Sequence, residues 1–217
     1  DRVLNGRGNV NPELAKRILD IAERERYQPN QLAQALIRSR QRTLIGMVIP
    51  SVGNPFFDEV LRGAQSRARK LSSYGTTLTI REIKGYDAAT QLQAMRRLVA
   101  EGVDALAGMP LDVPGVAGYL QSLPIPVVTV NTDIDVDRVA FVGCDYYNSG
   151  MITGDLVQLM LNGRGRVAAV IGSTNVRGHM DRVRGLRTAL EGTPEITVDA
   201  VLENQDDDDV SYQVLRA

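Results

Sequence analysis

The head of the chain places apolar side chains three or four positions apart, whereas the rest alternates short apolar runs with helical segments. The spacing in the head predicts a helix over residues 12–27, with Asn11 as its cap and Pro12 in its first turn. A two-turn segment follows over residues 30–37, and so short a helix is marginal by itself. Because the pattern changes at Thr43, the head and the body form different structural units.

In the body, short apolar runs bounded by Gly, Pro or Asn predict strands, and amphipathic segments between them predict helices. We expect strands over residues 44–49, 76–80, 103–107, 126–130, 139–142, 167–171 and 198–202. We expect helices over residues 55–74, 88–101, 116–123, 148–161, 178–190 and 208–216. Such alternation indicates an α/β fold with parallel sheets and right-handed crossovers. A polar stretch at 131–133 separates two series of strands, which predicts two doubly wound subdomains, the second incomplete.

These patterns divide the chain into a helical head over 1–27, a hinge over 28–42, a first subdomain over 43–133 and part of a second over 134–217. Charge follows the same division. Residues 1–42 carry nine Lys or Arg and five Asp or Glu, although the whole chain has a net charge of −1. A basic head on an acidic body is typical of an appendage that contacts DNA. A solvated helix with ordinary charge scatter is the alternative interpretation.

Several classes of protein are disfavoured by what the sequence lacks. With Cys144 as the only cysteine and a single histidine, it contains neither an intrachain disulfide nor a zinc cluster. Neither a membrane-spanning apolar run nor a signal peptide is recognisable, which predicts a cytoplasmic protein. Nucleophile-elbow, phosphate-loop and dinucleotide-binding motifs are missing from their required contexts. The sequence therefore predicts no enzyme, no catalytic residue, no cofactor and no metal site.

Four motifs occur in a fixed order along the chain. They are RVLNG at residues 2–6, the helical segment at 12–27, the spacing Asn-x-x-Ala-x-x-Leu at 30–36, and the segment 45–57 that ends in NPFF. In this order they resemble the end of the recognition helix, the last headpiece helix, the hinge helix and the first strand and helix of the effector domain in the LacI/GalR family of bacterial transcription regulators. The resemblance implies a partial helix-turn-helix headpiece joined to a periplasmic-binding-protein-like effector domain.

The resemblance also implies a DNA-binding surface. In the family, the hinge helices of a dimer lie in the minor groove, and a leucine at the place of Leu36 wedges between base pairs and kinks the duplex. The alternative is that Leu36 packs on the body of the protein. The family often has arginine where this chain has Gln34, which would weaken phosphate contacts. The candidate DNA-binding residues are Arg2, Asn5, Asn30, Ala33 and Leu36.

The family pattern further implies that the chain is truncated at both ends. Most of the recognition helix would precede Asp1, and the remaining strands of the effector domain would follow Ala217. Because base-edge contacts come from the recognition helix, we expect this fragment not to read an operator with normal specificity.

A ligand-binding crevice is expected where the carboxyl ends of the parallel strands meet. Ser51, Asn54, Phe56 and Phe57 follow the first predicted strand and would lie there. Helical periodicity puts Phe57 on the apolar face of the next helix, so its default role is core packing. Phe56 falls off that stripe and can point into the crevice. The family commonly uses aromatic side chains here to stack on a sugar or a base.

A second group of candidates follows the predicted strand at 167–171. Arg182 opens the motif Arg-x-x-Gly-Leu, which resembles the family's Arg-x-x-Gly-Phe, and matches the arginine that grips effector oxygens. Its forked donors suit hydroxyls or a carboxylate, and a surface salt bridge is the alternative. Arg177 and His179 are weaker candidates, and Asp145 matches an acidic position near the interdomain hinge. The run Asp206–Asp209 is read as a solvated loop that opens a helix.

Together these features predict a ligand-responsive transcription regulator, a repressor, that acts as a homodimer on operator DNA. A small sugar or a similar polar metabolite is the expected effector. A periplasmic-type sugar-binding transport receptor is the alternative, because it shares the two subdomains and the crevice. Such a receptor needs neither a basic head nor a hinge helix.

Overall fold

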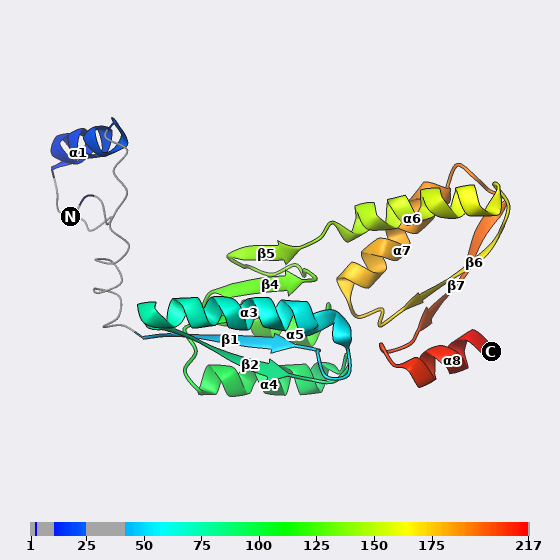
Figure 1. The fold of residues 1–217 in the computed structure, drawn as a ribbon, viewed down its shortest axis with the longest axis horizontal. Helices are drawn as coiled ribbons and strands as arrows, with labels where there is room; N and C mark the ends of the chain where they lie inside the picture. The colour runs from blue at the N-terminus through cyan, green and yellow to red at the C-terminus, as the bar shows by residue number, and fades with distance from the viewer. Residues whose placement is uncertain (1–2, 4–10, 25–41, 217) are drawn as a thin grey trace.

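A computed structural model describes residues 3, 11–24 and 42–216 of the chain (Figure 1). In the head, helix α1 spans Pro12–Arg24, and the Asn11 side chain accepts a hydrogen bond of 2.9 Å from the Glu13 N–H. This is the predicted cap. The candidate DNA-binding residues Arg2, Asn5, Asn30, Ala33 and Leu36 lie outside the described residues, as does most of the proposed hinge.

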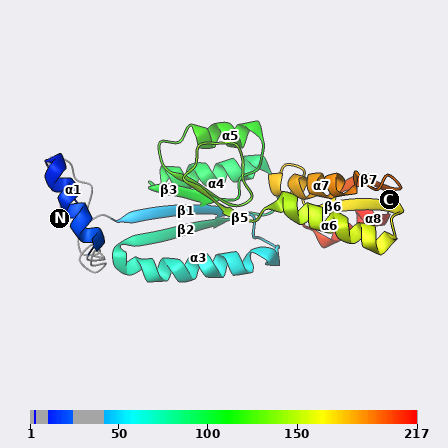
Figure 2. The same ribbon diagram turned by 90° about the horizontal axis from the view of Figure 1, so that it is seen from above.

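The first subdomain is built on a five-stranded parallel sheet with the order β2-β1-β3-β4-β5. Its strands are β1 (Thr43–Ile49), β2 (Thr76–Glu82), β3 (Ala105–Gly108), β4 (Val127–Asn131) and β5 (Ala140–Gly143). Its helices are η1 (Pro55–Phe57), α3 (Asp58–Leu71), η2 (Ser72–Tyr74), α4 (Ala88–Ala100) and α5 (Pro114–Gln121). Figure 2 shows α3 on one face of the sheet and α4 and α5 on the other.

Strand β5 lies at the edge of this first sheet, where the sequence predicted that it would begin the second series. Val128–Asn131 of β4 pair in parallel with Ala140–Gly143 of β5, and the Val139 N–H donates to the Val127 carbonyl at 2.8 Å. The two strands are joined by a loop without a helix. The placement of this strand in the second subdomain is therefore wrong, because the chain returns to the first sheet before it crosses over.

The second subdomain pairs β6 (Gly165–Ile171) with β7 (Ile196–Glu203) in parallel. Its helices are α6 (Tyr146–Leu161), α7 (Arg177–Leu190) and α8 (Asp208–Arg216). Helices α6 and α7 pack closely on each other because glycines lie at their contact. A Cβ atom on Gly150 would stand 2.1 Å from the carbonyl oxygen of Arg182. A side chain at this position would therefore push the two helices apart.

The two subdomains have separate hydrophobic cores. The larger core lies between the five-stranded sheet and its helices, and its innermost side chains include Val48, Ile49, Phe57, Leu98, Leu106 and Val116. The smaller core joins α7 to the second sheet through Leu186, Leu190 and Ile196. Burial of these apolar side chains is the main favourable term in folding. The loops at the ends of the strands are thus attached to two separately packed subdomains.

A buried amide shapes one of these loops. Gln91 of α4 is 1% exposed; its Nε2 donates to the Met109 carbonyl at 2.9 Å, and its Oε1 accepts from the Leu111 N–H at 2.9 Å. Replacing Gln91 with leucine leaves both buried backbone groups without a partner, so we expect the free energy of unfolding to fall by about 2 kcal/mol. Urea unfolding followed by circular dichroism measures the change. Gln93→Leu, on the exposed face of the same helix, is the matched control, and an equal effect of both substitutions would contradict this reading.

Candidate functional site

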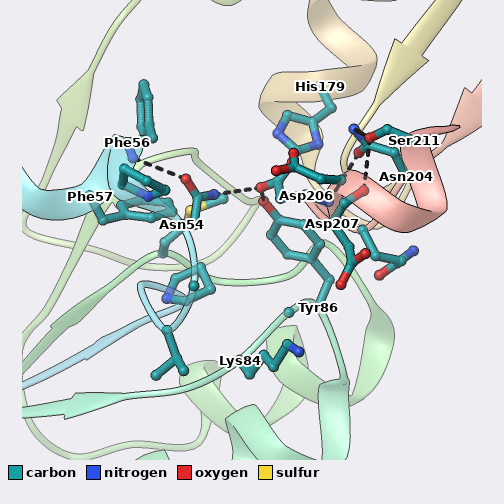
Figure 3. A pocket seen from close by; sticks show the side chains of 18 of the residues that line it. Asn54, Phe56, Phe57, Lys84, Tyr86, His179, Asn204, Asp206, Asp207 and Ser211 are labelled. Atoms are coloured by element: carbon teal, nitrogen blue, oxygen red, sulfur yellow. Dashed lines mark hydrogen bonds between the residues drawn. The ribbon is translucent and has the colours of Figure 1, made fainter.

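A cleft with a volume of about 860 Å³ lies between the two subdomains (Figure 3). Its walls are the loops that follow β1, β2, β3 and β7, together with the first turns of α7 and α8 and the last residue of β4. The cleft is therefore at the carboxyl ends of the strands, where ligands bind in open α/β sheets. Both sheets contribute to it, so its geometry depends on how the subdomains meet.

The loop after β1 turns sharply and places two aromatic rings in different environments. Asn54 Oδ1 accepts from the Phe56 N–H at 3.0 Å, and η1 starts at Pro55. Phe57 is 1% exposed and belongs to the core, whereas Phe56 is 58% exposed and lines the cleft. The rings lie edge to face with centroids 5.1 Å apart. The buried ring thus supports the exposed one, which is free to meet a ligand.

Asp206 accepts hydrogen bonds across the cleft from the first subdomain. Its Oδ2 accepts from Asn54 Nδ2 at 2.7 Å and from the hydroxyl of Tyr86, which follows β2 (Figure 3). Burial and the hydrogen bond to Asp206 both raise the pKa of Tyr86, so its hydroxyl stays protonated as a neutral donor. The ring of His179 stands edge to face on Tyr86 with centroids 5.7 Å apart. A carboxylate acceptor is thereby held by neutral donors at the centre of the cleft.

Arg182 supplies a positive charge to the same cleft from α7. Its guanidinium carbon lies 3.9 Å from the centroid of the Tyr146 ring. This cation–π contact favours one orientation of the guanidinium group. The hydroxyl of Tyr146 in turn donates to Asn131, the last residue of β4. Asn131 has a positive φ of 64° and also lines the cleft. Arg182 is thus a preorganised set of donors.

Three of the sequence candidates lie away from this cleft. Ser51 is buried and donates to Glu82 at 2.6 Å. Arg177 forms an ion pair with Asp112 at 2.8 Å, and Asp145 accepts from the Asn148 N–H at 2.9 Å as the cap of α6. The structure brings together Asn54, Phe56, Phe57 and Arg182 from the candidates, with His179 beside them.

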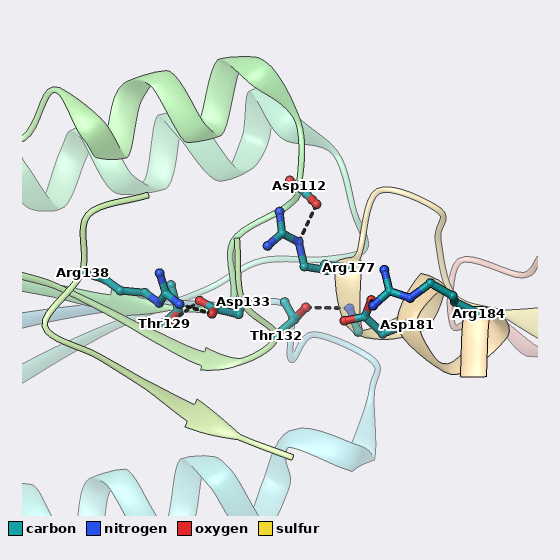
Figure 4. Close-up of polar contacts among 9 residues, drawn as sticks. Asp112, Thr129, Thr132, Asp133, Arg138, Arg177, Asp181 and Arg184 are labelled. Atoms are coloured by element: carbon teal, nitrogen blue, oxygen red, sulfur yellow. Dashed lines mark hydrogen bonds and ion pairs between the residues drawn. The ribbon is translucent and has the colours of Figure 1, made fainter. Parts of the chain in front are cut away.

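Arg177 and Asp145 line a second cavity of about 760 Å³ at the crossover between the subdomains. Figure 4 shows the polar contacts of Arg177 and its neighbours there. The Gly178 N–H donates to Thr132 Oγ1 at 2.8 Å, which joins the start of α7 to the loop after β4. In this cavity Arg184 is paired with Asp181 at 2.9 Å, as Arg177 is with its own aspartate. Each arginine is thus paired with a carboxylate, and the Arg177–Asp112 pair and the Gly178–Thr132 hydrogen bond join the start of α7 to the first subdomain.

Sequence reasoning missed the residues that complete the cleft, namely Tyr86, Asn131 and Asp206. Asp206 lies in the exposed turn before α8, as the sequence predicted, but it also accepts hydrogen bonds from two side chains of the other subdomain. Asp207 does open a helix, since its Oδ1 accepts from the N–H groups of Asp209 and Val210. The available signal was position: Asp206 lies in the loop that follows β7, as Asn54 lies in the loop that follows β1.

His179 gives the site a pH dependence. Burial lowers the pKa of its imidazole below the ordinary value, although a hydrogen bond with the Ser173 backbone and the charge of Asp206 partly oppose this shift. The unfolded chain therefore binds a proton at a pH where the folded chain does not. We expect His179 to destabilise the fold as pH falls below about 6.5, with the loss complete below the folded pKa.

Urea unfolding at pH 7.5 and pH 5 measures this contribution against the background of other titrating groups. The His179→Gln variant should lose less stability over that interval than the unmodified protein. Equal losses in the two proteins would mean that His179 does not carry the effect.

Within the part of the chain that the structure describes, no helix is long and apolar enough to cross a membrane. The same residues contain no group of three His, Cys, Asp or Glu side chains arranged to hold a metal ion.

A family profile for the periplasmic binding protein domain matches residues 45–217. The chain belongs to this family. Among solved structures it is similar to GanP, a glucose-galactose binding protein from Geobacillus stearothermophilus, with a TM-score of 0.69 and 24% identity over 81% of this chain and 65% of that chain. An ABC transporter solute binding protein from Burkholderia graminis, in complex with D-arabinose, has a TM-score of 0.72 and 24% identity over 81% of this chain and 61% of that chain. These similarities confirm the predicted α/β fold of the effector domain.

Curated relatives are transcription regulators. Catabolite control protein A of Priestia megaterium is 28% identical over 87% of this chain and 55% of its own length. The HTH-type transcriptional regulator RegA of Clostridium acetobutylicum is 32% identical over 64% of this chain and 41% of its own length. The chain thus spans about half the length of the curated relatives that it matches. The resemblance to LacI/GalR regulators is confirmed.

Proposed function

We propose that the protein is a ligand-responsive DNA-binding transcription regulator, a repressor, whose cleft binds a sugar or a similar small polar metabolite. The observation that carries this proposal is the meeting of Phe56, Arg182 and Asp206 in one cleft between two subdomains. An exposed aromatic ring matches the apolar face of a sugar, while the guanidinium donors and the carboxylate acceptor match its hydroxyls. Relatives named as regulators support the link to transcription.

The mechanism is linkage between the cleft and the hinge. A ligand that contacts both walls of the cleft binds one relative orientation of the subdomains more tightly and shifts the population toward it. Residues 28–42 lead directly into β1, so a change in that orientation reaches the hinge. A coupling free energy of about 1–3 kcal/mol between effector and operator is sufficient for regulation, and it acts equally in both directions.

For the DNA-binding part, we propose the five residues drawn from the family resemblance: Arg2, Asn5, Asn30, Ala33 and Leu36. Leu36 would wedge into the minor groove, and the others would contact DNA beside it. A homodimer would present two hinge helices to a two-fold symmetric operator. This proposal places the protein in the cytoplasm with the DNA it regulates, and it assigns no chemical reaction to the cleft.

The test uses the complete gene product and DNA from upstream of its own gene and of neighbouring sugar genes. Fluorescence anisotropy should show binding of one such DNA, and a sugar that binds the cleft should change that affinity by about 5- to 150-fold. Arg182→Gln should abolish the response to sugar while DNA binding without sugar persists. Sugar binding without any DNA binding would instead favour the transport receptor, and turnover of a sugar would contradict both.

A further inference from the structure

We infer that Asp206 makes the cleft selective for an uncharged polyhydroxyl ligand over its phosphorylated or carboxylated counterparts. This inference rests on the proposed function of the cleft and names the class of effector within it. It is carried by the hydrogen bonds of Asp206 and by the distribution of charge around that residue.

The hydrogen bonds show what kind of group Asp206 takes. Its Oδ2 faces the opposite wall of the cleft and accepts there from the amide of Asn54 and the hydroxyl of Tyr86. Both are neutral donors, and a sugar hydroxyl is a donor of the same kind. A carboxylate has about four acceptor positions, so one ligand can add hydroxyl donors or replace these protein donors. A phosphate or carboxylate on the ligand offers acceptors only and meets Asp206 as a like charge.

The other charged side chains of the cleft also disfavour an anionic ligand. Its lining includes the four carboxylates of Asp206–Asp209 against the cations of Lys84 and Arg182. Asp206 accepts from the Tyr86 hydroxyl, the ring of Tyr86 meets that of His179 edge to face, and Arg182 lines the same cleft, so an acceptor and a donor of opposite charge line one cavity. Adjacent hydroxyls, which donate and accept together, satisfy such a pair. An anionic group on the ligand would lose its hydration and enter a cleft that already carries an excess of negative charge.

Isothermal titration calorimetry on the purified chain tests this selectivity with matched probes. The neutral sugars are D-glucose, D-galactose, D-fructose and D-arabinose, and each is compared with its phosphate and, for the two aldohexoses, with its uronic acid. We expect at least one neutral sugar to bind, with its anionic counterparts weaker by about tenfold or more. An anionic counterpart that binds as tightly as its neutral parent, or more tightly, overturns the inference and leaves the proposed function intact. Binding of neither kind overturns both.

The assignment to Asp206 is tested by Asp206→Asn, which keeps the size of the side chain and removes its charge. The neutral sugar should bind about tenfold more weakly, and the ratio of neutral to anionic affinity should shrink by a similar factor. Asp155→Asn, on the exposed face of α6, removes the same charge far from the cleft lining and should leave the ratio unchanged. An unchanged ratio in Asp206→Asn, in a variant whose thermal unfolding matches the unmodified protein, overturns the assignment.

Discussion

Replacing Gly185 with alanine is expected to reduce the free energy of unfolding of the second subdomain by more than about 3 kcal/mol. Gly185 lies in α7 where that helix crosses α6. A Cβ atom there would stand 2.0 Å from the carbonyl oxygen of Tyr147 and 2.8 Å from the backbone nitrogen of Met151. Both neighbours are helical backbone, so neither can move aside as a flexible side chain would. The two helices must separate to admit the methyl group.

Urea unfolding followed by circular dichroism measures this loss, with Gly63→Ala as the matched control. Gly63 lies in α3 with open space where its Cβ would be. Alanine favours a helix over glycine by about 1 kcal/mol, so this control should be neutral or slightly stabilising. If the two variants unfold at the same urea concentration, the close approach of α6 and α7 at Gly185 is not real.

Truncation of the two adjacent phenylalanines should separate stability from ligand binding. Phe57→Ala removes a fully buried ring and should destabilise the first subdomain by about 3–5 kcal/mol, the cost of a large cavity. Phe56→Ala removes a ring that is 58% exposed in the cleft, and its effect on stability should stay below about 1 kcal/mol. Its effect should instead fall on sugar affinity, with a loss of about tenfold or more.

The comparison needs two measurements on each variant: thermal unfolding and calorimetric titration with a sugar that the unmodified chain binds. The paired design makes each phenylalanine the control for the other. Loss of stability in Phe56→Ala, or normal stability in Phe57→Ala, would show that the two rings had been assigned to the wrong environments.

The local features of this protein were predictable from sequence alone because they depend on neighbours in the chain. The alternation of apolar runs and amphipathic segments indicated the parallel α/β fold, and each expected strand and helix of the body has a counterpart in the structure. Periodicity also separated Phe57 from Phe56, and Asn11 caps the helix that begins beside it. In these cases the relevant spacing is a few residues, within one turn or one strand.

The membership of sheets and the composition of the cleft depended on contacts between distant parts of the chain. Periodicity identifies β5 as a strand but does not say which sheet it joins. Arg177 and Arg182 lie five residues apart on α7, yet the rotation of the helix sends one to Asp112 and the other to the cleft. Asp206 meets Asn54 across 152 residues of sequence. The sequence therefore determined the elements and the fold class, whereas only the packing of the two subdomains decided which side chains share one cavity.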